Sequence, residues 1–516
     1  MATKIAALDV LPARLPSLLV AIYELPRWSI LLFAAVCVRA LTFGNPVVHV
    51  DEEFYFVTAQ RMLEGALPYV DVWDRKPIGL FLIYLPPAAF GVPLGIWVYQ
   101  MMALASVVGT ALLIGRLAER AGWGKGALAA SLLYIFMLGF GDGQGGQSPV
   151  FYNLLVACAF LLVMPHPEDA SGDRRRLHRA MLAMALIGIS MQIKYSVVFE
   201  GMFLGLWLIW REWKLGTTLA HILRRGAVLA AIACVPTLLA GAVYFAIGHG
   251  DAWAYANFGS ILERRSDPSS ELIRAFLKVA LILALPLIIS GLSRHVPVND
   301  ESEHPVRALL FGWLIASVVG LLVFGSWFNH YALPVMVPAC LCCAGFLGST
   351  QIGRKVFMPV MLLAAMGGGE YTAWSAMWHR GNAEELDTLA NGIGRGRGCL
   401  YIHSGDSILY SFTGRCAVTS WIFPSHLSRE RENGAVGVDQ IAEEGRIFAK
   451  KPEVVVMRPE YLGERLEVRK VALRAMQTLG YRLTGRYPLG DQMINVYKLP
   501  TARSEGTPRL AANRPS

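Results

Sequence analysis

The chain has 516 residues, of which 54% are hydrophobic and only 16% are charged. A soluble globular protein carries about 25% charged residues, so this composition excludes that class and predicts a polytopic α-helical membrane protein. The net charge of +9 does not indicate nucleic-acid binding, because the basic residues gather in short loops between apolar segments, where the positive-inside rule expects them.

The N-terminal residues 1–27 contain basic side chains ahead of the first apolar segment. This charge pattern predicts that they lie in the cytoplasm and that residues 29–43 form a retained membrane anchor. Arg39, near the outer end of the anchor, is expected to extend to the membrane surface. The next loop, residues 45–77, then lies outside. Within it, residues 51–63 are predicted to form a short amphipathic helix on the membrane.

Residues 78–92 are apolar but short and interrupted by two prolines, so the sequence leaves open whether this segment crosses the membrane. The later segments alternate with basic loops, which predicts a transmembrane domain over residues 28–375 with about 11 to 13 spans. Residues 180–209 are too long for one span and predict a hairpin that turns near Lys194. The other expected spans are residues 94–117, 126–140, 149–164, 226–247, 272–292, 308–325, 331–347 and 356–374.

The C-terminal part changes in character and predicts a small extracytoplasmic α/β domain over residues 376–500. Its expected strands are residues 399–403, 453–458 and 493–499, and its expected helices are residues 438–449 and 465–479. Residues 501–516 are polar and predict a disordered tail. Cys399 and Cys416 lie in this part and can form a disulfide if it faces an oxidising compartment. The sequence does not give their separation, so both alternatives stay open.

Charged residues beside a membrane tend to face a cavity and serve a function. On the expected outer side, well-separated loops supply two or three carboxylates and several cations, which suits group transfer from a phosphate. A carboxylate takes the proton of the acceptor, and cations stabilise the departing phosphate. No phosphate-binding glycine motif of a nucleotide fold is present, which favours a lipid-linked donor. The candidates are Asp51, Glu52, Arg75, Lys76, Asp142, Lys194, His330 and Tyr331.

Each candidate also has a structural alternative. Asp51 and Glu52 lie where a helix begins and can simply cap it. The cations and aromatic residues can anchor the chain at the membrane surface. Asp142 lies among glycines, where aspartate is a common turn residue. An unpaired ammonium at Lys194, in the middle of a hairpin, would be costly without a partner or ligand.

The same residues form a series that is typical of one family of membrane enzymes. Asp51-Glu52 follows the first span, with Tyr55 shortly after, and Arg75-Lys76-Pro77 closes the loop. His330-Tyr331, followed by Pro334, opens a late span. In these features the chain resembles the GT-C glycosyltransferases of family 39, the protein O-mannosyltransferases and the lipid A aminoarabinose transferases. It departs from the aminoarabinose transferases at Arg75, where they carry glutamate.

The resemblance implies a GT-C-like fold and transfer of a sugar, with inversion, from a polyprenyl phosphate to an acceptor hydroxyl outside the cytoplasm. Asp51 would be the general base, with Glu52 orienting it or assisting. Lys76, with Arg75 or Lys194, would hold the lipid phosphate. A divalent cation, Mg²⁺ or Mn²⁺, is compatible with such carboxylates, but no spacing decides it. The remaining residues expected to line the cavity are Tyr55, Asp142, His330 and Tyr331.

Two other functions agree with the composition. A flippase or transporter of lipid-linked sugars would favour inverted repeats and charges at mid-membrane depth, and an O-antigen-type polymerase or ligase would depend on a large late loop. This chain concentrates its charge in the first loop instead, which favours the transferase. The expected location is the bacterial inner membrane, and the expected partners are the lipid-linked donor, membrane lipids and a glycan, lipid or protein acceptor. The sequence does not distinguish among sugars or acceptors.

Overall fold

The computed structural model describes residues 25–165 and 173–500. Most of the segment predicted to be cytoplasmic (residues 1–27) and the whole of the tail predicted to be disordered (residues 501–516) lie outside the described residues.

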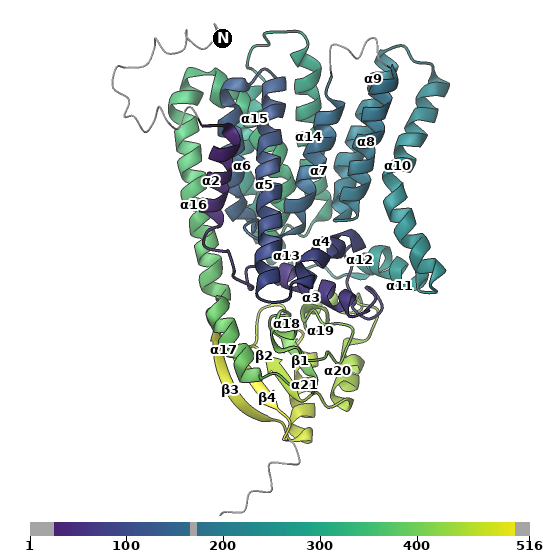
Figure 1. Ribbon diagram of the computed structural model, residues 1–516, viewed down its shortest axis with the longest axis vertical. Helices are drawn as coiled ribbons and strands as arrows, with labels where there is room; N and C mark the ends of the chain where they lie inside the picture. Colours follow the sequence, from purple (N-terminus) through teal and green to yellow (C-terminus); the bar gives the residue numbers. More distant parts are fainter. Residues whose placement is uncertain (1–24, 166–172, 501–516) are drawn as a thin grey trace, which may run out of the picture.

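A bundle of long helices forms the larger part of the molecule (Figure 1). In the described ranges, seven helical segments are long and apolar enough to cross a membrane, which agrees with the predicted multi-pass membrane protein. The total of 11 to 13 spans stays a prediction. The bundle helices are α2 (Arg27–Arg39), α5 (Leu94–Arg120), α6 (Ala127–Met137), α7 (Ser148–Val163), α8 (Asp173–Met191), α9 (Val198–Lys214), α10 (Leu219–Ala246), α13 (Ser269–Ser293), α14 (Glu303–Phe324), α15 (Leu333–Ser349) and α16 (Met358–Arg380).

The bundle has a buried centre and an apolar outer surface. In the segment that contains α15, 83% of the apolar 18-residue stretch is buried inside the protein. In α10 and α13 only 22% of the corresponding stretch is buried. Small residues explain the position of α15, because a side chain at Gly348 would overlap the backbone of Gly126 ahead of α6. The exposed leucines, isoleucines and phenylalanines of α10 and α13 form a surface suited to lipid. The hairpin predicted near Lys194 is present between α8 and α9.

Two short helices lie at the lower end of the bundle in Figure 1, between it and the C-terminal part: α3 (Val50–Leu63) and α4 (Ile78–Ala89). The 12 residues of α4 extend over about 18 Å, which is less than a hydrocarbon core of about 30 Å. Helix α4 alone is therefore shorter than a full span, and whether this segment crosses stays open. Helix α3 is buried between the two parts of the molecule. Its Phe54 and Val57 are at most 1% exposed, so they contact protein rather than lipid.

The C-terminal part contains a four-stranded sheet in the order β1-β2-β4-β3. Strand β1 (Leu400–Ser404) is parallel to β2 (Val454–Met457), and β4 (Gln492–Lys498) runs antiparallel to both β2 and β3 (Arg482–Leu489). Helices α20 (Gln440–Ala449) and α21 (Leu466–Leu479) accompany the sheet, as predicted. A disulfide joins Cys399 to Cys416. We call residues 382–499 the sheet region; it also contains α17 (Ala383–Ile393).

A buried ionic network holds the core of the sheet region together. His403, on β1, lies between two glutamates: its Nδ1 is 3.0 Å from Glu444 Oε1 and its Nε2 is 3.6 Å from Glu464 Oε1. Glu464 also accepts two hydrogen bonds from Arg469 Nη1. Burial acts to lower the pKa of His403, but the two carboxylates outweigh it and raise the pKa to about 9. The imidazolium is therefore the stable form at neutral pH.

This network predicts how the stability of the sheet region depends on pH. Because the pKa of His403 is higher in the folded chain than its ordinary value of about 6.5, its stabilising contribution is complete below that value and is lost as the pH rises through about 9. The melting temperature of the wild type should therefore exceed that of His403→Gln at pH 6, and the difference should shrink by pH 10. A difference that is equal at both pH values would contradict the assignment.

Candidate active site

A cavity of about 960 Å³ lies where the lower end of the bundle meets the sheet region. Five parts of the chain form its wall. They are the loop after α2 (residues 45–77, the first loop), the glycine-rich loop after α6 (residues 141–147), the α8–α9 hairpin, the start of α13 and the sheet region. Of the predicted site residues, all but Glu52 line it: Asp51, Tyr55, Arg75, Lys76, Asp142, Lys194, His330 and Tyr331. Segments that are far apart in the sequence therefore converge on one space.

Asp51 lies in the first turn of α3, whose preceding residue His49 caps the helix by accepting the backbone N–H of Asp51. The Asp51 side chain is 16% exposed, and its Oδ1 is 3.7 Å from Lys76 Nζ. Burial acts to raise the pKa of Asp51, but the Lys76 ammonium and the His49 ring outweigh it and hold the pKa below its ordinary range. Asp51 is consequently an ionised carboxylate that faces a cavity.

Lys76 is fixed in position by charges and by aromatic rings. Its Nζ is 3.2 Å from Asp74 Oδ2, and its backbone N–H donates to Asp74 Oδ1 at 2.8 Å. The ammonium also lies 5.3 Å from the ring centre of Tyr55 and 5.5 Å from that of Phe423 in the sheet region. His426, also in the sheet region, has its Nε2 3.4 Å from Asp74 Oδ2. The sheet region therefore helps to hold a cation of the first loop.

Glu52 points away from the cavity, into the protein. It is fully buried and packs so closely against the glycine-rich loop that a side chain at Gly145 would overlap its carboxylate. Burial raises the pKa of Glu52 to about 7, with the backbone of Gly146 and the Arg39 guanidinium acting in the opposite direction. A residue that touches no part of the cavity wall is placed to hold the loop rather than to meet a substrate.

Arg39 does not extend to the membrane surface, so that expectation is wrong. It is 1% exposed and donates to the carbonyl oxygens of Gly143 and Gly145, at 2.8 and 2.6 Å. The glycine-rich loop runs close enough to α2 to accept both bonds, and these carbonyl groups would otherwise lack partners in an apolar environment. Arg39 and Glu52 together fix the loop that carries Asp142.

Arg75 joins the first loop to the sheet region. Its Nη1 is 2.6 Å from Glu432 Oε2, its Nε donates to Ser260 Oγ at 3.0 Å, and a further bond goes to the carbonyl oxygen of Ala435. Although Arg75 contacts the cavity, its donors are largely occupied by protein groups. Its geometry therefore supports a structural role beside, or in place of, phosphate binding.

Lys194 differs from the other cations of the site. Among the described residues it has no ion-pair or hydrogen-bond partner, and its Nζ lies 4.3 Å from the ring centre of Tyr331. Tyr331 belongs to the short helix η7 (Asn329–Ala332), which also carries His330. Burial lowers the pKa of Lys194 to about 7, and an anion bound beside it would favour the charged ammonium.

Several cavity residues were not anticipated from the sequence. Asp74 and His426 support Lys76, and the cations Arg264, Arg429 and Arg431 line the side of the cavity towards the sheet region. Arg431 and Arg264 share the carboxylate of Glu432. The only signal was the local charge of residues 429–432, Arg-Glu-Arg-Glu, which looks like an ordinary solvated surface without the fold.

No family model matches the chain, and no curated protein matches it. Among solved structures, it is similar to ArnT from Cupriavidus metallidurans bound to undecaprenyl phosphate, with a TM-score of 0.62 at 15% identity over 91% of this chain and 98% of that chain. It is also similar to the Archaeoglobus fulgidus oligosaccharyltransferase tethered with an acceptor peptide (TM-score 0.48, 12% identity, 92% and 74% covered). A third is the arabinofuranosyltransferase AftD from mycobacteria (TM-score 0.43, 14% identity, 92% and 42% covered).

At these low identities the similarity is one of fold, and it is clear only for ArnT, whose TM-score exceeds 0.5. The likeness to ArnT extends over nearly the whole of both chains. It therefore confirms, at the level of the fold, the predicted resemblance to the GT-C glycosyltransferases.

Proposed function

We propose that this protein is a glycosyltransferase that moves a sugar from a polyprenyl phosphate to an acceptor hydroxyl outside the cytoplasm. The observation that carries the proposal is the pairing, in one cavity, of an ionised carboxylate with an unpaired ammonium. Asp51 faces the cavity beside Lys76, and Lys194 faces it without a protein partner among the described residues. Group transfer from a phosphate needs both a proton acceptor and a cation for the leaving group.

In the proposed reaction, Asp51 takes the proton of the acceptor hydroxyl as its oxygen attacks the anomeric carbon of the donor. The bond between that carbon and the phosphate oxygen breaks, and the configuration is inverted. The phosphate leaves on its lipid with its bonding electrons, and Lys194 and Lys76 stabilise its charge. Tyr55, His330 and Tyr331 shape the cavity. Arg75 contributes chiefly by holding the sheet region in place.

We propose that the protein lies in the bacterial inner membrane with its N-terminus in the cytoplasm. The cavity and the sheet region are then on the extracytoplasmic side. The disulfide between Cys399 and Cys416 supports this orientation, because disulfides persist in oxidising compartments such as the periplasm. We propose residues 376–500 as a periplasmic domain that covers the cavity and admits a glycan, lipid or protein acceptor.

The first test replaces Asp51 with asparagine, which keeps the shape of the side chain but cannot take a proton. Transfer from a polyprenyl-phosphate sugar to envelope extract in detergent should fall by about 10²- to 10⁴-fold. Asp387→Asn is the matched control: it makes the same change at an exposed aspartate of α17 outside the cavity, so the rate should not change. Equal loss in both variants, or full activity in Asp51→Asn, would reject Asp51 as the base. Lipid translocation without transfer would favour the flippase.

The second test concerns the leaving phosphate. Lys194→Met removes the unpaired ammonium, and loss of a charge-assisted bond of about 1.5–3 kcal/mol should weaken binding of polyprenyl phosphate by roughly 10- to 150-fold. Lys470→Met, an exposed lysine of α21, controls for the loss of a positive charge and should not change binding. Unchanged affinity in Lys194→Met would assign the phosphate to other cations.

The third test concerns orientation. Protein taken from intact cells is denatured and labelled with a maleimide polymer. Without reductant six of the eight cysteines should react, and after reduction all eight should. Cells that lack their periplasmic disulfide-forming enzyme should give eight in both cases, because Cys399 and Cys416 would then stay reduced. Eight modifications without reductant in normal cells would place the sheet region in the cytoplasm.

A further inference from the structure

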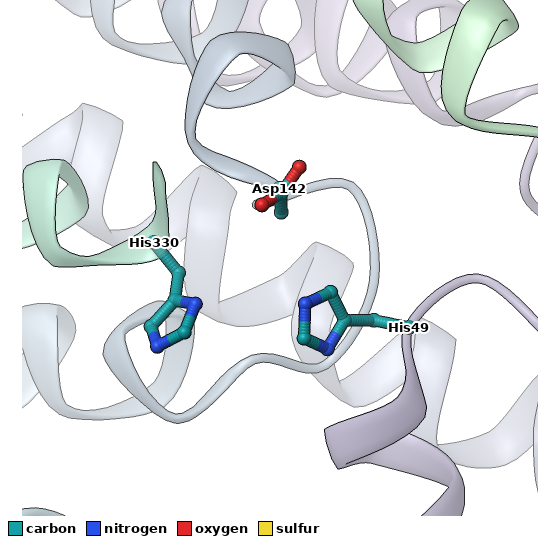
Figure 2. A group of neighbouring side chains, drawn as sticks. All are labelled: His49, Asp142 and His330. Carbon is teal, nitrogen blue, oxygen red and sulfur yellow. The ribbon is translucent and has the colours of Figure 1, made fainter. Parts of the chain in front are cut away.

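Three potential metal ligands face one another at the inner wall of the cavity. His49 caps α3, Asp142 follows the short helix η3 (Leu138–Gly141), and His330 lies in η7. Each offers one ligand atom, and these atoms all lie within 4.8 Å of one another. Figure 2 shows the two imidazole rings and the carboxylate pointing into a common space from three separate segments. The two ring centres are 5.8 Å apart, with the rings edge to face.

Two of these three groups have no polar partner. Among the described residues, neither the Asp142 carboxylate nor the His330 ring forms a hydrogen bond or an ion pair, and the His330 ring lies beside those of His49, Phe328 and Tyr331. A partly buried carboxylate and imidazole are costly without polar partners, and a cation bound between them would supply those interactions. The arrangement therefore calls for a ligand.

The backbone around Asp142 is built to deliver its side chain. A side chain at Gly141 or Gly143 would come within 2.8 or 2.9 Å of Leu333 Cδ2, so the two glycines let this loop lie directly against the start of α15 without displacing Leu333. That contact brings Asp142 beside His330. Asp142 itself has a left-handed backbone, with φ of 53°, a conformation that aspartate and asparagine tolerate better than most residues.

His49 can act as a ligand through Nε2 if its Nδ1 carries the proton. Nδ1 lies 2.5 Å from the side-chain amide of Gln147, whose Oε1 is buried without a partner. Rotation of this amide by a half turn places Oε1 where it accepts the Nδ1 proton. The exchange gives up the cap bond from the Asp51 backbone at 3.2 Å and the long bond that Gln147 Nε2 donates to Asp51 Oδ2 at 3.5 Å. A metal-bound histidine usually donates its other N–H in this way, which orients the ring.

We propose that His49, Asp142 and His330 bind a divalent first-row transition metal, with Zn²⁺ the best fit. Mg²⁺ and Ca²⁺ prefer oxygen ligands, whereas two imidazoles with one carboxylate match zinc and its neighbours. Ligand atoms around tetrahedral Zn²⁺ lie about 3.3 Å apart, so the three side chains close by up to about 1.5 Å on binding. Three protein ligands leave a coordination position open.

The open position faces the cavity, because all three ligands line it. The nearest charges are mixed. Asp51 favours a cation, with its Oδ2 3.7 Å from His49 Nδ1, whereas Arg380, Lys76 and Lys194 oppose it. If the proposed transfer is correct, the metal would bind an oxygen of the acceptor beside Asp51 and ease its deprotonation. The binding itself does not depend on that function.

The test measures metal binding by the whole, tag-free protein in detergent after treatment with a chelator. Equilibrium dialysis against Zn²⁺ with elemental analysis should give one ion per chain. Co²⁺ should bind in its place and show visible absorption bands of imidazole coordination. Asp142→Asn, which keeps the left-handed backbone accessible, and His330→Gln should each weaken Zn²⁺ binding by at least tenfold and alter the Co²⁺ spectrum.

His249→Gln is the matched control, because His249 is exposed and lies outside the cavity; it should bind like the wild type. Absence of a stoichiometric ion in the wild type, or equal binding in the wild type, Asp142→Asn and His330→Gln, would overturn the proposal. Tight Mg²⁺ binding with no effect of His330→Gln would also overturn it, because the imidazoles would then not be ligands. Loss of transfer in Asp51→Asn with Zn²⁺ still bound would keep the two proposals apart.

Discussion

The site depends on one partly buried cation, Lys76, held between the carboxylates of Asp51 and Asp74. Two acids and one base leave a net negative charge in a partly apolar setting, which is costly unless further groups compensate. His426 supplies a donor to Asp74 from the sheet region, and aromatic faces surround the ammonium. The position of Asp51 therefore depends on a contact between two parts of the chain that lie more than 300 residues apart in the sequence.

The glycine-rich loop is the second constraint, and it acts through close approach rather than through flexibility. Gly145 lies against the Glu52 carboxylate, and Gly143 lies against Leu333. Arg39 ties the loop to α2 by its carbonyl groups. A side chain at either glycine would displace the Glu52 carboxylate of α3 or Leu333 of α15. The loop thus sets the distances among the segments that form the inner wall of the cavity.

Much of this was predictable where the signal is local. The apolar segments predicted the helix bundle. The charges around Asp51 and Lys76 indicated a cavity, because charged side chains beside the hydrocarbon are costly unless they face one. Adjacent residues were harder to separate. Asp51 and Glu52 differ by about 100° around a helix, so one faces the cavity and the other the core, but a sequence does not say which. Strand β3 was missed because its residues are mostly exposed and include Gly485 and Pro488, which mask a strand pattern.

The partners of Arg75 show why the remainder needed three dimensions. Glu432, which forms its ion pair at 2.6 Å, lies in a charged stretch that has no motif of its own. The aminoarabinose transferases that this chain resembles carry an acid at the position of Arg75, and an acid there would repel Glu432. The ion pair is therefore a feature of this chain, and it fixes the position of the sheet region against the first loop. That region forms part of the cavity wall through Phe423, Arg429 and Arg431. The residue at position 75 therefore affects the shape of the cavity through the position of the sheet region, a dependence that no local motif reveals.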